Sequence, residues 1–103
     1  MDHKTVEEYI LSMPNAKLDY PFGKDVAVYK VNDKMFALIT ENKVPLQVSL
    51  KCDPQLSEVL REKYETVMPG YHLNKKHWNT IIMGQLSWGE LQSLIRLSYE
   101  LVA

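Results

Sequence analysis

Cysteine and glycine are scarce in this sequence, and both scarcities exclude classes of protein. Cys52 is the single cysteine, so the chain cannot form an intramolecular disulfide, whereas small secreted domains usually carry several. The four glycines are isolated, so the chain has no glycine-rich loop of the kind that binds the phosphates of a nucleotide cofactor. We therefore expect a protein of the reducing cytoplasm that uses no cofactor.

Long apolar runs and a strong net charge are also missing. Residues 1–8 are charged and mixed, unlike the apolar centre of a signal peptide, and no apolar run is long enough to cross a bilayer. The 12 lysines and arginines are balanced by 13 aspartates and glutamates, which gives a formal charge of -1. No global field therefore draws the chain to a membrane or to nucleic acid, and any binding of a polyanion must be local.

The length and the composition predict one folded domain. With 103 residues and a hydrophobic share of 46%, the chain is large enough to bury one core but too small for two. We assign residues 1–103 to a single domain and expect it to be a monomer.

Three segments have the apolar spacing of helices. Their predicted starts are a capping box formed by Thr5 and Glu8, the cap Asp53 followed by Pro54, and a second capping box formed by Ser87 and Glu90. The predicted apolar stripe of the middle helix consists of Leu56, Val59, Leu60 and Tyr64. We expect Arg61 to lie on the outer face of that helix.

Two neighbouring segments predict a β-hairpin. Residues 26–31 and 35–40 are rich in β-branched and aromatic side chains, and residues 32–34 between them are polar and favour a turn. Shorter strands are expected within residues 15–25, 67–71 and 78–83.

A further strand is indicated by alternation between Leu46 and Cys52. Apolar and polar residues alternate there, which predicts that Ser49 and Lys51 lie on a solvent face. Because helices and strands do not alternate regularly along the chain, we predict an α+β fold, a two-layer antiparallel sheet flanked by helices.

Residues 72–78 form a local basic and aromatic run. Its lysines can neutralise phosphates, its amide and histidines can donate hydrogen bonds, and its indole offers a stacking face. The composition also fits a structural loop in which Lys75 and Lys76 are solvated, Trp78 anchors the core, and His72 and Asn74 hold a turn. The residue types alone favour this structural interpretation, because pairs of surface lysines are common.

Other reactive side chains do not assemble into a recognisable site. His72 and His77 lack the further ligands that a zinc site needs, so we expect no metal. The alternation that buries Cys52 also hides its thiol, so we expect no catalytic residue and no enzymatic activity. The segment Tyr20 to Gly23 is expected to close one end of the core.

The motifs in residues 20–23, 48–54, 69–80 and 98–102 together resemble the MmcQ/YjbR family of small bacterial proteins. This resemblance implies a fold related to CyaY-like and secretion-chaperone-like domains, in a double-wing arrangement. The family is described as DNA-binding, a label that rests largely on similarity of fold and surface. It implies that Lys51, Lys75, Lys76 and His77 contact phosphates and that Asn74 and Trp78 contact bases or sugars, while His72 is structural.

Two functional hypotheses follow. The first is weak DNA binding without sequence specificity through the basic patch, because about three phosphate contacts give only micromolar or weaker affinity. The alternative is a module that binds a protein or a small ligand and has no nucleic-acid role. An exposed apolar patch around residues 20–22 would favour this alternative.

Overall fold

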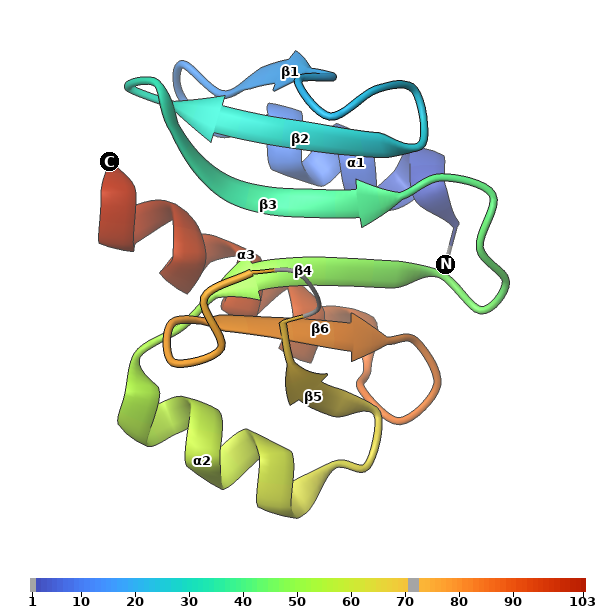
Figure 1. Cartoon of the computed structure of the whole chain (residues 1–103), viewed down its shortest axis with the longest axis vertical. Coiled ribbons are helices and arrows are strands. Elements are labelled where there is room, and N and C mark those ends of the chain that lie inside the picture. Colours follow the sequence, from blue (N-terminus) through green and yellow to red (C-terminus); the bar gives the residue numbers. More distant parts are fainter. Residues whose placement is uncertain (1, 71–72) are drawn as a thin grey trace.

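The fold consists of three helices and one sheet of six antiparallel strands. The computed structural model describes residues 2–70 and 73–103. The elements are α1 (His3–Leu11), β1 (Lys17–Asp19), β2 (Val26–Val31), β3 (Lys34–Thr40), β4 (Gln47–Lys51), α2 (Pro54–Lys63), β5 (Val67–Pro69), β6 (Trp78–Ile82) and α3 (Trp88–Val102). The strand order is β1-β2-β3-β4-β6-β5, which confirms the predicted α+β fold (Figure 1).

The predicted hairpin is formed by β2 and β3. Asn32 and Asp33 at its turn have φ angles of 53° and 61°, a left-handed conformation that asparagine and aspartate tolerate better than most residues. The turn residues therefore fix the register in which Val31 lies opposite Lys34.

The helix starts confirm two of the three predicted caps. Ser87 and Glu90 form the capping box of α3, and Asp53 accepts hydrogen bonds from the first turn of α2. The prediction for α1 was wrong, because Asp2 caps the helix by accepting a 2.9 Å hydrogen bond from the amide of Thr5, which lies inside it. Among residues 2–70 and 73–103, no helix has the length and apolar character needed to cross a bilayer.

The main core lies between the sheet and the two helices α1 and α3. Both helices lie behind the sheet in Figure 1. Apolar side chains of the two helices and of the four central strands form one cluster there, which includes Val6, Ile10, Tyr29, Phe36, Ile39, Val48, Ile81, Leu91 and Ile95. Burial of these side chains is the main favourable contribution to folding.

The opposite face of the sheet is also largely buried, which corrects the prediction of a wet face on β4. Ser49 and Thr80 are only 9% and 6% exposed, and their hydroxyl oxygens are 2.9 Å apart in a hydrogen bond. A second apolar cluster of Val28, Leu38 and Trp78 lies on this face, with Leu73 packed against it. Leu73 therefore helps to cover a surface that alternation alone would assign to solvent.

Helix α2 lies beside β5 at one edge of the sheet (Figure 1). Its predicted apolar stripe was wrong in part, because Val59 is 57% exposed whereas Ser57 is 1% exposed. Arg61 was predicted to face solvent but reaches inward to Asn79 of β6. Helix α2 is therefore held to this edge of the sheet by polar contacts as well as apolar ones.

Tyr29 is a fully buried ionisable side chain of the main core, and its hydroxyl donates to the carboxylate of Glu7. Burial, together with this carboxylate, raises the pKa of Tyr29 far above its ordinary value. The folded phenol therefore keeps its proton where the unfolded phenol ionises, so stability is complete below about pH 10 and falls as the pH rises further.

Replacing Tyr29 with phenylalanine is expected to remove this alkaline loss of stability. Above about pH 10, the free energy of unfolding of the wild type should fall by an additional 1.4 kcal/mol or so per pH unit relative to Tyr29→Phe. Urea unfolding between pH 9 and pH 11.5 measures the difference. Equal slopes for the two proteins would contradict the buried, protonated state of Tyr29.

Candidate nucleic-acid interface

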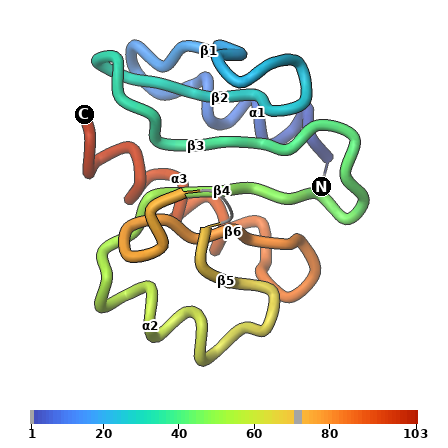
Figure 2. Tube along the Cα trace, viewed as in Figure 1, coloured from blue at the N-terminus to red at the C-terminus, as the bar shows by residue number. Residues whose placement is uncertain are grey.

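The structure brings the end of β4 and the loop 73–77 together at one end of the sheet (Figure 2). Lys51, the last residue of β4, lies opposite Trp78, the first residue of β6. The amide of Cys52 donates a 2.8 Å hydrogen bond to the carbonyl of His77. The predicted contacts Lys51 and His77 are therefore held next to each other by the sheet itself.

Asn74 organises the loop from within. Its side-chain oxygen accepts a 3.0 Å hydrogen bond from the amide of Lys76. Its carbonyl oxygen accepts further bonds from the amides of His77 and Trp78, at 3.2 Å and 2.9 Å. This is the local pattern by which asparagine stabilises turns, and it fixes the backbone that carries the two lysines.

Arg61 of α2 holds the same loop from outside. Its guanidinium donates to the carbonyl oxygens of Lys75 and Trp78, at 2.6 Å and 3.2 Å, and to the side-chain oxygen of Asn79 at 2.8 Å. These bonds occupy one edge of the guanidinium, so Arg61 positions the loop. The spacing of Ser57 and Arg61 by four residues puts both on one helix face, and this is the signal in the sequence that could have indicated their role.

Asn79 connects Arg61 to the remainder of α2. It is 2% exposed, and its amide nitrogen donates a 3.1 Å hydrogen bond to the hydroxyl of Ser57. A buried amide thus has both ends of its side chain satisfied, as buried polar groups usually do. The chain Ser57, Asn79 and Arg61 is a rigid support beneath the loop.

The basic side chains of the loop point to solvent. Lys75, Lys76 and His77 are exposed, and Lys51 is half-buried. In the part of the chain that the structure describes, none of these four residues takes part in an ion pair. Three lysine charges are therefore free to meet an anionic ligand at this end of the sheet.

Trp78 must be removed from the predicted contacts. Its side chain is 4% exposed and packs with Val28 and Leu38, so the indole offers no stacking face. The backbone of Gly70 lies so close that a β-carbon there would be 2.8 Å from Cβ of Trp78. Asn74 is exposed, whereas His72, predicted to be structural, lies outside the described residues.

Cys52 is a buried side chain beside this loop. Burial is the main cause that raises the pKa of its thiol, with a smaller contribution from Asp53. A raised pKa leaves little thiolate near neutral pH, so the thiol is poorly suited to nucleophilic attack.

The segment after β1 does not close the core as predicted. Tyr20 is 42% exposed and Phe22 is 61% exposed, and Val44 in the loop after β3 is 97% exposed. The segments 20–25 and 41–46 lie at the same end of the sheet, opposite the end that carries the basic loop (Figure 2). Apolar side chains are thus presented to solvent at the end of the sheet opposite Lys51, Lys75 and Lys76.

Comparison with known proteins gives relatives over nearly the full chain. The chain is 38% identical to the uncharacterised protein YbdF of Escherichia coli O157:H7 over 97% of its length and 83% of that protein. It is 34% identical to the uncharacterised protein YjbR of Escherichia coli K12 over 90% of its length and 80% of that protein.

Solved structures agree with these relatives. A crystal structure of a Deinococcus radiodurans protein with a DUF419 domain matches with a TM-score of 0.90 at 36% identity, over 95% of this chain and 75% of that one. A crystal structure of a Pseudomonas syringae protein matches over 100% of both chains with a TM-score of 0.86 at 32% identity. The YjbR family model matches residues 11–101. The chain therefore belongs to the YjbR family.

Proposed function

We propose that this protein binds nucleic acid weakly and without sequence specificity through Lys51 and the loop 74–77. The observation that carries the proposal is the group of three lysines without ion pairs among the described residues, two of them on a backbone fixed by Asn74 and Arg61. A preorganised loop loses little conformational entropy when it binds, which favours contact with a phosphate backbone.

The charge of the chain limits the strength of this binding. The formal net charge is -1, so attraction depends on the local lysines alone. Each phosphate contact contributes a slope of about -0.9 to the dependence of log K on log salt concentration, so three contacts give about -2.7. Affinity is then micromolar or weaker and falls steeply as salt rises.

Removing the two loop lysines is expected to abolish most of this binding. In Lys75→Ala/Lys76→Ala, the salt slope should fall by about two units and the dissociation constant at low salt should rise by about tenfold or more. Fluorescence anisotropy with a labelled 20-base-pair duplex and a labelled 20-nucleotide single strand, at 20 to 200 mM salt, measures both effects.

The matched control is Lys17→Ala/Lys43→Ala, which changes the net charge equally. Lys17 lies on the edge strand β1 and Lys43 follows β3, and both are exposed. This control should keep the wild-type slope, because neither lysine belongs to the proposed surface. Absence of binding by the wild type, or equal weakening in the two double variants, would exclude the loop as the site.

A second candidate function is the binding of another protein. The observation that favours it is the exposure of Phe22 and Val44 at the end of the sheet opposite the basic loop. Exposed apolar side chains that gather on one surface are typical of protein interaction sites. A wild type that gives no anisotropy change with either DNA at 20 mM salt would leave this as the better supported role.

A further inference from the structure

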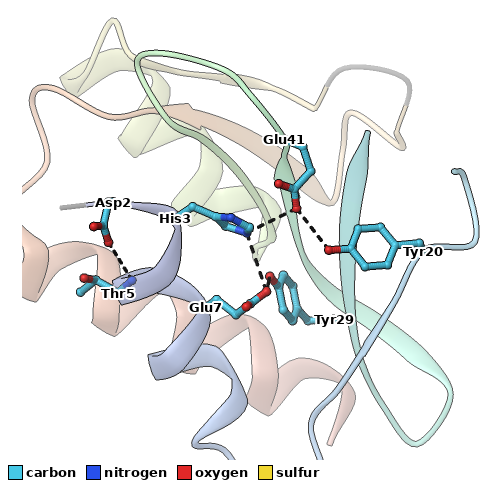
Figure 3. A network of polar contacts seen from close by, with 7 residues as sticks. All are labelled: Asp2, His3, Thr5, Glu7, Tyr20, Tyr29 and Glu41. Carbon is cyan, nitrogen blue, oxygen red and sulfur yellow. Dashed lines mark hydrogen bonds and ion pairs between the residues drawn. The ribbon is translucent and has the colours of Figure 1, made fainter. Parts of the chain in front are cut away.

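Five ionisable side chains form a chain of polar contacts at the start of α1 (Figure 3). They come from α1, β2, the end of β3 and the segment between β1 and β2. In order of contact they are Tyr29, Glu7, His3, Glu41 and Tyr20. This cluster lies at the end of the sheet opposite the basic loop and takes no part in the proposed function.

His3 occupies the centre of the cluster. Its Nε2 atom is 3.7 Å from a carboxylate oxygen of Glu7 and 3.5 Å from one of Glu41. The same atom is buried and has no hydrogen-bond partner among the residues that the structure describes. Both distances are within the range of an ion pair, but they are longer than an ordinary N–H···O hydrogen bond.

The two carboxylates are fixed by tyrosines. The hydroxyl of Tyr29 donates to Glu7, and the hydroxyl of Tyr20 donates to the same Glu41 oxygen that faces His3, at 3.3 Å. Burial and the neighbouring carboxylates raise the pKa of both phenols, so both remain donors across the neutral range. The phenols therefore hold two negative charges on either side of one imidazole.

The charge of the imidazole decides whether this arrangement is attractive. A protonated His3 attracts Glu7 and Glu41 together. A neutral imidazole carries no charge to offset the two carboxylates, and when its one N–H is on Nδ1 the Nε2 atom that faces them is an acceptor. Within the described chain, no three histidine, cysteine or acidic side chains are arranged to hold a metal ion.

We propose that His3 is a proton-operated latch that holds the first turn of α1 against the end of β3 when its imidazole is protonated and releases it when the imidazole is neutral. The groups that face the imidazole are Glu7 on its own helix and Glu41 directly after β3, with Tyr29 and Tyr20 behind them. Histidine is the side chain whose charge changes most readily near neutral pH, so the latch closes in acid and opens in base.

Opening of the latch affects more than the helix start. Tyr20 and Glu41 also line a surface cavity of about 580 Å³ together with Gly23, Lys24, Asp25 and Asn42. When the attraction of His3 for Glu41 is lost, one wall of this cavity loses a contact that positions it. A change in the charge of His3 therefore alters the cavity wall beside the segment that carries the exposed Phe22.

The test compares how the unfolding equilibrium depends on pH in the wild type and in His3→Gln. Glutamine keeps a polar side chain but cannot become charged. At pH 5.5 the unfolding equilibrium constant of His3→Gln should exceed that of the wild type by about fivefold, and at pH 8.5 the two should agree. In NMR spectra of the wild type, the amides of Val6, Glu7 and Asn42 should shift together over this range. Those shifts should vanish in His3→Gln.

Two matched controls separate the latch from general charge effects. His77→Gln removes a histidine that is exposed in the distant loop, and it should leave the pH dependence of stability unchanged. Glu41→Gln should weaken the pH effect, whereas Glu8→Gln, at an exposed neighbouring position of α1, should not. If His3→Gln keeps the wild-type pH profile, the latch is excluded. If that variant does not fold, wild-type amide signals at α1 and β3 that fail to shift together also exclude it.

Discussion

Replacing Asn79 with alanine is expected to lower the free energy of unfolding by about 3 kcal/mol, because two partners lose a buried amide at once. Asn79 is 2% exposed, and it accepts a hydrogen bond from Arg61 and donates one to Ser57. Alanine leaves the buried hydroxyl of Ser57 and part of the Arg61 guanidinium without these bonds. Urea unfolding at neutral pH measures the loss.

The matched control for Asn79 is Gln55→Ala. Gln55 also carries an amide and belongs to the same edge of the fold, but it is exposed in the first turn of α2. Its replacement should change stability by less than about 0.5 kcal/mol. Because Arg61 also holds the carbonyls of Lys75 and Trp78, Asn79→Ala should loosen the basic loop as well. Equal stability of the two variants would show that the polar support is not needed.

Features of the fold that depend on neighbours in sequence could be predicted. The capping box of Ser87 and Glu90 and the hairpin turn at Asn32 and Asp33 both follow from residue types within four positions of each other. The start of α1 shows the limit of this approach. Thr5 and Glu8 match the capping pattern, but Asp2 lies closer to the chain start and takes the cap instead.

Features that depend on distant segments could not be predicted in the same way. Ser49 alternates with apolar neighbours and so looks solvent-facing, but a hydrogen bond to Thr80 and the cover over the second face bury it. Arg61 looks like a solvated charge until α2 is placed against β6, where it finds carbonyls and an amide. In both cases the decisive partner is far away in the sequence.

The candidate site likewise has features that the sequence could predict and features that it could not. The run 72–78 stands out by composition, and its lysines are indeed exposed. The role of Trp78 could not be read from composition, because an indole serves equally as a stacking face or as a core anchor, and only its burial distinguishes the two. The family signature therefore contains residues that support the loop as well as residues that face solvent.

Replacing Ser98 with alanine is expected to lower the free energy of unfolding by about 2 kcal/mol, because its hydroxyl joins two strands where their own pairing stops. The last register pair between β3 and β4 at this end is Ala37 with Leu50. Beyond it, the fully buried hydroxyl of Ser98 donates to the carbonyl of Phe36 at 2.5 Å and accepts from the amide of Lys51 at 2.9 Å.

The matched control is Ser93→Ala on the same helix. Ser93 is exposed, and its hydroxyl donates to the carbonyl of Gly89 within α3, so its loss should cost less than about 0.5 kcal/mol. A loss for Ser98→Ala no larger than this would mean that the strands close the gap themselves. A larger loss, together with faster amide exchange at Lys51, would show that α3 uses one hydroxyl to hold the strand end that carries a lysine of the proposed interface.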